Sequence, residues 1–285
     1  MIKNMNFASP SKSCLGNKAE VTIRGGCVVF ILIASQYLFL IYIGSQASHI
    51  PRVCGHHGFR TVVFFWSKAV EYERVICFVD GFNLYHALLD LQKPSLKWLD
   101  LHLLFRRLSR HKSQVITQIL FFSAYATWKP ESYYRHRLYI KALSANGVTP
   151  VLGQFKKKPK QCFKCKAKWV DHEEKESDVN LALAMLDLAY KDRYDRAFLL
   201  SRDSDLAPAV RKVKENFPEK KVTVFSPYNY KHSSELLQAC DDHKTINLQH
   251  LSSSLFPEKI YDAGGNLITT RPVEYSPPRE ELVEA

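Results

Sequence analysis

Along most of the chain, short runs of consecutive apolar residues alternate with longer segments in which apolar positions recur every three or four residues. The runs are typical of strands buried on both faces of a parallel sheet, and the longer segments are typical of amphipathic helices. The predicted strands lie at 74–81, 114–126, 148–155, 196–201, 220–227 and 244–248. The predicted helices lie at 82–91, 98–108, 131–145, 177–190, 205–217 and 233–243. This alternation predicts a three-layer α/β/α fold with a mainly parallel sheet.

The first 69 residues form an N-terminal hydrophobic extension that lacks this alternation. Residues 25–48 contain no charged side chain and are long enough to cross a hydrocarbon core of about 30 Å as a helix. One interpretation is a transmembrane helix or signal anchor, which predicts a membrane-anchored protein. The other is that residues 1–69 are translated sequence upstream of a start near Val70, which predicts a cytoplasmic protein. Both interpretations stay open.

The remaining sequence divides into a main domain and a tail. The main domain is expected to span residues 70–250, with a lysine-rich insertion at 156–173. Residues 251–285 contain several prolines and end in a polar segment, so an extended C-terminal tail is predicted there.

Four aspartates stand where the predicted strands and helices place them near one another. Asp80 ends the first strand, Asp203 and Asp205 follow the fourth, and Asp178 lies in the first turn of the helix that begins at 177. Sites in parallel α/β sheets form outside the carboxyl ends of the strands, so these carboxylates are expected to converge. Crowded carboxylates favour Mg²⁺ or Mn²⁺, which would support hydrolysis of a phosphodiester. The alternative is that each aspartate only caps a helix or turn, with Asp205 as the cap of the helix that follows it.

The insertion adds a basic segment beside this acidic group. The whole chain has 40 Lys and Arg against 28 Asp and Glu, a net charge of +12, which favours a polyanionic partner or an anionic membrane surface. In the insertion the basic residues are Lys156, Lys157, Lys158, Lys160, Lys164, Lys166 and Lys168. Lysines of this kind bind nucleic-acid phosphates, and Trp169 or Phe163 is suited to stack on a base. The alternative is a solvated lysine-rich loop.

Cysteine usage bears on the compartment and on a second metal. The seven cysteines are scattered, which indicates a reducing environment rather than a disulfide framework. Cys162 and Cys165 have the spacing of a zinc knuckle, and His172 is a candidate third ligand. A structural zinc site needs four ligands and no second pair follows nearby, so ordinary reduced thiols are the alternative.

Three blocks of the sequence carry a resemblance to a known family. The blocks are "FVDGFNLY" at 78–85, "EKESDVNLALAMLDLAYKDRYDRAFLLSRDSDLAPAV" from 174, and "VTVFSP" from 222 followed by "SSELLQACD". They resemble the signature blocks of the NYN domain, a PIN-like nuclease family, over residues 73–248. The resemblance implies a PIN-like α/β/α fold and a ribonuclease activity that depends on Mg²⁺ or Mn²⁺. By motif it assigns the acidic cluster to Asp80, Asp178, Asp203 and Asp205.

The same resemblance gives two further residues a role. Asn83 would be a polar neighbour of the acidic cluster. Arg202 stands where the family more often has glycine, and it is expected to contact phosphate, pair with an acid or obstruct entry of the metal.

Three functions therefore follow from the sequence. The first is a ribonuclease acting on single-stranded or flexible RNA, and the second is an RNA-binding regulatory module without catalysis. The third follows only from the resemblance, since NYN chains of the bacterial type include 6-hydroxy-3-succinoylpyridine 3-monooxygenase, which uses NADH to hydroxylate a small aromatic substrate in nicotine breakdown. The chain has no G-x-G-x-x-G motif after a strand to support that cofactor. The sequence contains no signal for an oligomeric state.

Overall fold

The computed structural model describes four N-terminal strands by their main chain, at 19–24, 27–34, 37–43 and 60–66, and then residues 72–109 and 113–277. The chain divides into two compact units, Met1–Glu71 and Tyr72–Ala285. This division falls close to the boundary expected after residue 69.

The first unit contains one sheet with the strand order β1-β2-β3-β4. Its strands are β1 Ala19–Arg24, β2 Cys27–Ala34, β3 Tyr37–Ile43 and β4 Arg60–Trp66. The transmembrane helix considered for residues 25–48 is not formed in the described residues, because β2 and β3 pair there as antiparallel strands. An apolar run does not by itself distinguish helix from strand, and this one is rich in the β-branched and aromatic residues that favour strands.

Within the residues that the structure describes, no helix has the length and apolar character needed to cross a membrane. The question of a translation start near Val70 lies outside the described residues.

The second unit is built on a six-stranded sheet, and this confirms the predicted fold class. The strand order is β12-β11-β10-β5-β6-β7, and every neighbouring pair is parallel. The strands are β5 Glu73–Asp80, β6 Gln114–Ser123, β7 Val148–Leu152, β10 Arg196–Leu200, β11 Lys221–Ser226 and β12 Asp242–Thr245. The first and fourth predicted strands, now β5 and β10, are direct neighbours in register from Arg196 opposite Val75 to Leu200 opposite Val79.

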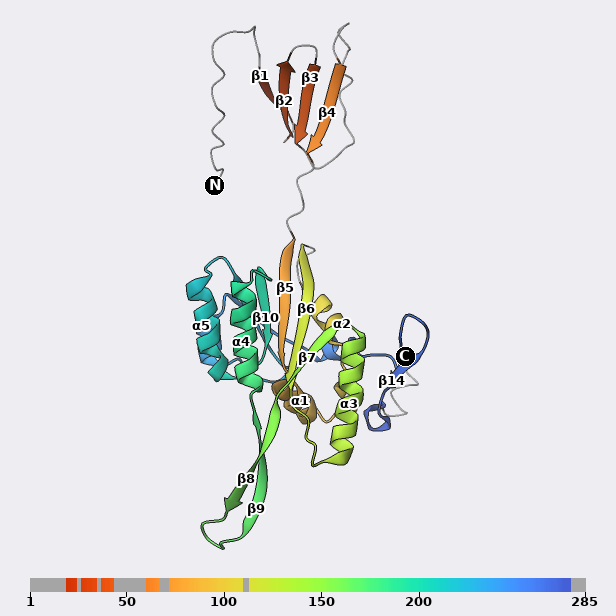
Figure 1. The fold of residues 1–285 in the computed structure, drawn as a ribbon, viewed down its shortest axis with the longest axis vertical. Helices are drawn as coiled ribbons and strands as arrows, with labels where there is room; N and C mark the ends of the chain where they lie inside the picture. The colour runs from red at the N-terminus through yellow and green to blue at the C-terminus, as the bar shows by residue number, and fades with distance from the viewer. Residues whose placement is uncertain are drawn as a thin grey trace. The chain divides into compact units, whose positions relative to one another are not determined.

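Helices cover both faces of this sheet, as Figure 1 shows. On one face lie α1 Gly81–Asp90, α2 Leu101–Leu108, α3 Pro130–Ala145 and α7 Leu248–Ser252. On the other lie α4 Ser177–Tyr190, α5 Ala207–Asn216 and α6 Ser234–Ala239. A hydrophobic core lies between the sheet and each group of helices. Alternate residues of β5 point into the two cores, with Val75, Cys77 and Val79 in the first and Ile76 and Phe78 in the second. Three short 3₁₀ segments complete the unit, at Pro94–Lys97, Ser204–Leu206 and Val273–Tyr275.

The lysine-rich insertion is an antiparallel hairpin of β8 Gln154–Gln161 and β9 Lys168–Lys175, which Figure 1 shows projecting from the sheet beyond β7. The predicted strand at 148–155 therefore ends early, at Leu152. Gly153 separates it from β8, where a Cβ atom would lie 2.6 Å from the Lys175 carbonyl oxygen. Cross-strand ion pairs of Lys158 with Glu173 and Lys160 with Asp171 stabilise a charged sequence that has no apolar alternation.

The predicted extended tail is wrong for the described part of residues 251–285. A hairpin of two strands, β13 Lys259–Tyr261 and β14 Leu267–Thr270, packs on the domain there. The indole nitrogen of Trp98 donates a hydrogen bond of 2.8 Å to the Pro257 carbonyl oxygen, and the buried Thr269 hydroxyl donates one of 3.3 Å to the Leu138 carbonyl. These long-range partners could not be read from the local proline content.

Gly81, at the turn from β5 into α1, has no room for a side chain. A Cβ atom there would lie 2.5 Å from the Phe122 carbonyl oxygen and 2.7 Å from the Phe121 ring. Because the carbonyl belongs to the neighbouring strand β6, the backbone must shift to accept a methyl group. We expect Gly81→Ala to lower the free energy of unfolding by about 2 kcal/mol. Urea denaturation measures the change.

The matched control is Gly264→Ala in the β13–β14 turn. The atoms nearest to a Cβ atom there belong to the Asn266 and Asp262 side chains, at 3.3 Å, and neither is a backbone atom. We expect a change of no more than about 0.5 kcal/mol. Equal stability of the two variants would contradict the close approach at Gly81.

Candidate active site

The structure brings the four predicted aspartates to the carboxyl edge of the sheet. Asp80 is the last residue of β5, and Asp203 and Asp205 follow the neighbouring strand β10. Asp178 is the second residue of α4. The negative charges of Asp80, Asp203 and Asp205 all raise the pKa of Asp178, so the four carboxylates share one electrostatic environment.

Asp80 is buried, with 3 % of its surface exposed, and it has a structural role. Its Oδ1 accepts hydrogen bonds from the backbone N–H groups of Phe82, at 3.1 Å, and Asn83, at 3.0 Å, and so caps α1. Its Oδ2 accepts from the Asn83 amide and from the Ser201 hydroxyl, the latter at 2.8 Å. Burial raises the pKa of Asp80, while these hydrogen bonds act to lower it.

Asp178 is the most strongly perturbed of the four acids. It is partly buried, and desolvation together with the neighbouring carboxylates raises its pKa from 3.8 to about 6. Among those carboxylates, Asp80 raises the pKa of Asp178 most, followed by Asp203, Glu174 and Asp205. A carboxyl held this far above its ordinary pKa lies where negative charge accumulates without a protein cation to balance it.

Asp203 and Asp205 are joined to Asp80 through Ser201, a residue that the sequence reasoning did not single out. The Ser201 hydroxyl is buried, donates to Asp80 and accepts from the Asp203 backbone N–H at 3.1 Å. Asp203 Oδ1 in turn accepts from the Asp205 N–H at 3.0 Å. Asp203 therefore caps the 3₁₀ segment, and the alternative of Asp205 as the cap is not observed. The position of Ser201, directly after an apolar strand and before the acids, was the available signal.

The acidic cluster fits a hard divalent cation by its chemistry, because its donors are carboxylate oxygens that repel one another. Within the described residues the Asp178 carboxylate accepts no hydrogen bond, and its pKa is raised first by desolvation and then by the neighbouring carboxylates. The side chains do not form a finished cage, since in residues 72–109 and 113–277 no three His, Cys, Asp or Glu side chains are placed to hold one metal ion. Asp178, Asp203 and Asp205 are the residues that would hold the ion, while both oxygens of the fourth predicted ligand, Asp80, already accept hydrogen bonds.

Asn83 lies where the resemblance implied, with its amide on Asp80. Of the roles expected of Arg202, pairing with an acid is not observed in the described residues, while contact with phosphate and obstruction of metal entry stay predictions. Its guanidinium lies 3.8 Å from the centre of the Tyr230 ring, and in the described part of the chain it forms no ion pair. Its buried Nε has no hydrogen-bond partner there.

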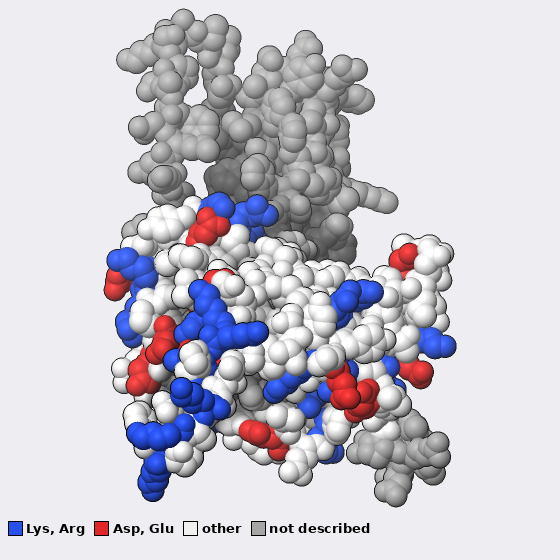
Figure 2. Space-filling model, turned by 60° about the horizontal axis from the view of Figure 1, so that its bottom comes forward, with Lys and Arg blue, Asp and Glu red and all other residues white. Residues whose placement is uncertain are grey.

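The basic residues of the hairpin are partly neutralised. Lys158 is paired with Glu173, and Lys160 with Asp171, whereas Lys156, Lys157 and Lys164 are exposed. Trp169 is also exposed, with 49 % of its surface accessible. Figure 2 shows Lys and Arg side chains in several groups with Asp and Glu between them, rather than one continuous basic patch.

The three predicted zinc ligands are not brought together. Cys162 and Cys165 lie in the turn at the tip of the hairpin, beyond the last strand pair of Gln161 with Lys168. His172 is opposite Lys157, four residues along β9 from Lys168, a separation of about 13 Å at the rise of a strand. The turn lowers the pKa of Cys162, because the backbone N–H groups of Cys165 and Lys164 donate to its sulfur.

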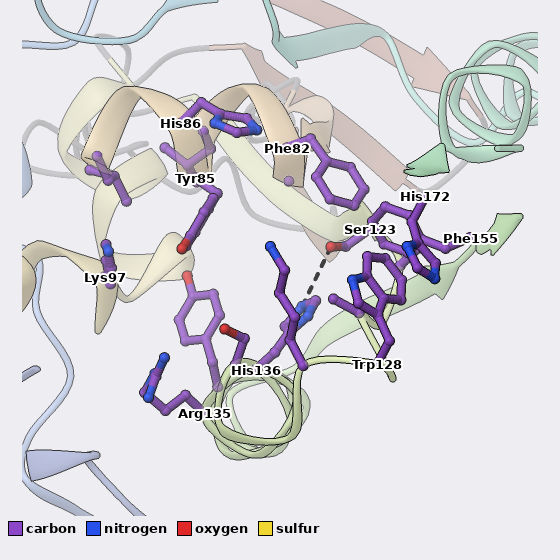
Figure 3. Close-up of a pocket in the computed structure, with 18 of the residues that line it drawn as sticks. Phe82, Tyr85, His86, Lys97, Ser123, Trp128, Arg135, His136, Phe155 and His172 are labelled. Atoms are coloured by element: carbon purple, nitrogen blue, oxygen red, sulfur yellow. Dashed lines mark hydrogen bonds between the residues drawn. The ribbon is translucent and has the colours of Figure 1, made fainter. Parts of the chain in front are cut away.

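His172 instead lines a pocket that sequence reasoning missed, here called the aromatic pocket. It has a volume of about 520 Å³ and lies among α1, α3 and the base of the hairpin. Figure 3 shows Trp128, Phe155 and His172 on one side of it and Lys97 and Arg135 on the other. Gly81 and Phe82 also line it, so it begins directly beside the α1 turn that Asp80 caps. Only the fold reveals it, because its lining residues come from separate parts of the sequence.

The fold and this edge define an α/β/α domain with an acidic site where parallel strands end. The family profile of the NYN domain matches residues 74–248. The chain therefore belongs to the NYN domain family, within the PIN-like nuclease superfamily. No curated protein matches the chain. Among solved structures, a protein of unknown function from Vibrio parahaemolyticus is similar at 19 % identity and a TM-score of 0.46, over 67 % of this chain and 100 % of that one.

Proposed function

We propose that this protein is a metal-dependent ribonuclease that hydrolyses single-stranded or flexible RNA at the acidic cluster. The observation that carries the proposal is the raised pKa of Asp178 beside three further aspartates at the carboxyl edge. Membership of the NYN family supports a nuclease-like activity. A Mg²⁺ or Mn²⁺ ion, when bound, supplies a polarised phosphate and a hydroxide nucleophile.

The chain's own residues have distinct tasks in this proposal. Asp178, Asp203 and Asp205 are the acids with oxygens available to the ion, while Asp80 holds the turn between β5 and α1 through its four donors. Ser201 couples Asp80 to the backbone of Asp203 and so fixes the spacing of the two loops. The exposed Lys156, Lys157 and Lys164 would bind RNA phosphates along the hairpin.

The test uses the full chain with an end-labelled single-stranded RNA and Mn²⁺. We expect the protein to cleave this RNA and EDTA to stop the cleavage. We expect Asp203→Asn to reduce the cleavage rate at least about 100-fold, because a metal ligand is lost. The asparagine Oδ1 can still accept from the Asp205 N–H, so the fold should persist. The control is Asp187→Asn, an exposed carboxylate on α4 that pairs with Lys191 at 2.7 Å. Equal cleavage by Asp203→Asn and wild type would refute the proposed site.

The aromatic pocket favours a second candidate, the NADH-dependent monooxygenase. An aromatic lining with Lys97 and Arg135 at one end suits a flat aromatic acid such as a pyridine carboxylate. A parallel assay with NADH, O₂ and a hydroxypyridine tests it by the oxidation of NADH. RNA binding without cleavage or NADH oxidation would indicate the regulatory module.

A further inference from the structure

The aromatic pocket and the acidic cluster are joined by two structural elements. Phe82 lines the pocket, and its backbone N–H is held by Asp80. Phe155 lines the pocket from β8, and it stands opposite Glu174, whose charge acts on Asp178. A polymer held at the acids therefore has this pocket next to it.

The hairpin side of the pocket is a cluster of aromatic rings. The His172 ring lies parallel to the Trp128 indole, with 3.8 Å between the ring centres and 9° between the planes. The Phe155 ring meets Trp128 edge-on at 4.6 Å and Phe82 edge-on at 5.7 Å. Rings positioned by one another in this way form a rigid wall for a flat, stacking group.

The opposite side is positively charged. The Lys97 ammonium lies 5.1 Å from the centre of the Tyr85 ring and 5.9 Å from that of Tyr275. In the described residues Lys97 has no carboxylate partner, and burial, together with the nearby Arg135, lowers its pKa. Arg135 itself is paired with Glu274 at 3.0 Å. Lys97 is thus a desolvated cation for which an anion would be a favourable partner.

Polar groups between the two sides can recognise a ring edge. His136 is held near Ser123, with 3.4 Å between its Nε2 and the hydroxyl oxygen. Burial lowers the pKa of His136 to about 4, so the imidazole is neutral at pH 7 and presents one donor and one acceptor. The Nε2 of His172 has no hydrogen-bond partner in the described structure.

We propose that the aromatic pocket binds one unpaired nucleotide of the RNA, with its base against Trp128 and Phe155 and its phosphate at Lys97. This inference rests on the proposed function for the identity of the polymer. The volume of about 520 Å³ lies within the range of about 300–1,000 Å³ found for pockets that hold small organic molecules. The substrate class that follows is RNA with a flexible base near the scissile bond, because a base within a duplex cannot reach the pocket.

Binding of mononucleotides tests the pocket without any need for cleavage. The full chain is titrated with uridine and adenosine 5′-monophosphates in EDTA, by calorimetry and by tryptophan fluorescence. We expect saturable binding that Trp128→Ala weakens about tenfold, the effect of removing one stacking ring, and that Trp128→Phe largely keeps. Loss of the fluorescence change in Trp128→Phe would place the ligand at this indole.

A second pair of variants tests the charged side. Lys97→Gln is expected to weaken the binding of the monophosphates several-fold. The binding of the nucleosides uridine and adenosine should not change, because only the phosphate contacts the ammonium group. The control is Tyr261→Ala on β13, a 52 % exposed aromatic residue outside the pocket, which should bind like wild type. Circular dichroism confirms that each variant is folded.

The outcomes separate this inference from the proposed function. Nucleotide binding at Trp128 in a protein that cleaves no RNA would support the pocket and reject the ribonuclease. RNA cleavage with an unchanged KM in Trp128→Ala, and no nucleotide binding, would reject the pocket and keep the ribonuclease. Saturation by nicotinate without any binding of nucleotides would overturn the inference in favour of a free aromatic acid.

Discussion

Asp178→Asn is expected to lower RNA cleavage at least about 100-fold while leaving the protein as stable as wild type or more so at pH 7.5. In the described structure the side chain has no hydrogen bond to lose, and its ionised form is disfavoured by burial and by the charges of Asp80, Asp203 and Glu174. Asparagine removes that repulsion. After allowance for solvent around a partly exposed group, we expect the free energy of unfolding to rise by about 1 kcal/mol.

The stability difference between wild type and Asp178→Asn is expected to depend on pH. The pKa of Asp178 is about 6 in the folded chain and has an ordinary value of 3.8. Below about pH 3 the carboxyl is protonated in the folded and unfolded states, so wild type and variant should be equally stable. As the pH rises from about 4 to 6, the unfolded chain ionises this carboxyl while the folded chain keeps it protonated, so wild type loses stability relative to the variant, and above about pH 6 the difference stays constant. Urea denaturation at pH 4.5 and 7.5 without metal measures this, and a difference that does not grow with pH would contradict it.

Asp80→Ala is expected to damage both activity and stability, in contrast to Asp178→Asn. Alanine leaves the N–H groups of Phe82 and Asn83 and the Ser201 hydroxyl without their acceptor at a buried position. Loss of a helix cap together with unsatisfied buried donors predicts a decrease of about 2–4 kcal/mol in the free energy of unfolding. Thermal and urea denaturation measure it.

Asp80→Asn is the conservative comparison for that variant. Its Oδ1 still accepts from the two backbone N–H groups, so most of the lost stability should return, whereas cleavage should stay low because the charge is gone. A fully stable Asp80→Ala protein would show that the cap is dispensable. Recovery of cleavage in Asp80→Asn would show that the charge of Asp80 is not required.

Much of the fold was predictable from the apolar pattern, because parallel strands buried on both faces have a strong sequence signal. The six strands and the helices between them are examples. The hairpin of β8 and β9 was not, because ion pairs such as Lys158 with Glu173 stabilise it in place of an apolar face. The strands at residues 27–43 were not predicted either, because a continuous apolar run is compatible with a helix as well as with a strand.

The acidic cluster was predictable because its aspartates lie at the end of β5, in the loop after β10 or in the first turn of α4, and β5 and β10 are neighbours. The hydrogen bonds within the cluster were not predictable, because the contacts of Ser201 depend on the direction of its side chain. The aromatic pocket was even less accessible to sequence reasoning. Trp128 and His172 lie far apart in the chain, and the fold alone makes their rings parallel.

The packing of the C-terminal segment extends the folded domain beyond the region that the family match covers. The family match ends at residue 248, yet Tyr275 lines the aromatic pocket and Glu274 holds Arg135 beside it. Phe256 and Pro257 also cover the buried Trp98. A chain cut at the end of the family region would expose this indole and open one wall of the pocket. The folded unit that contains the aromatic pocket therefore extends about thirty residues beyond the region that defines the family.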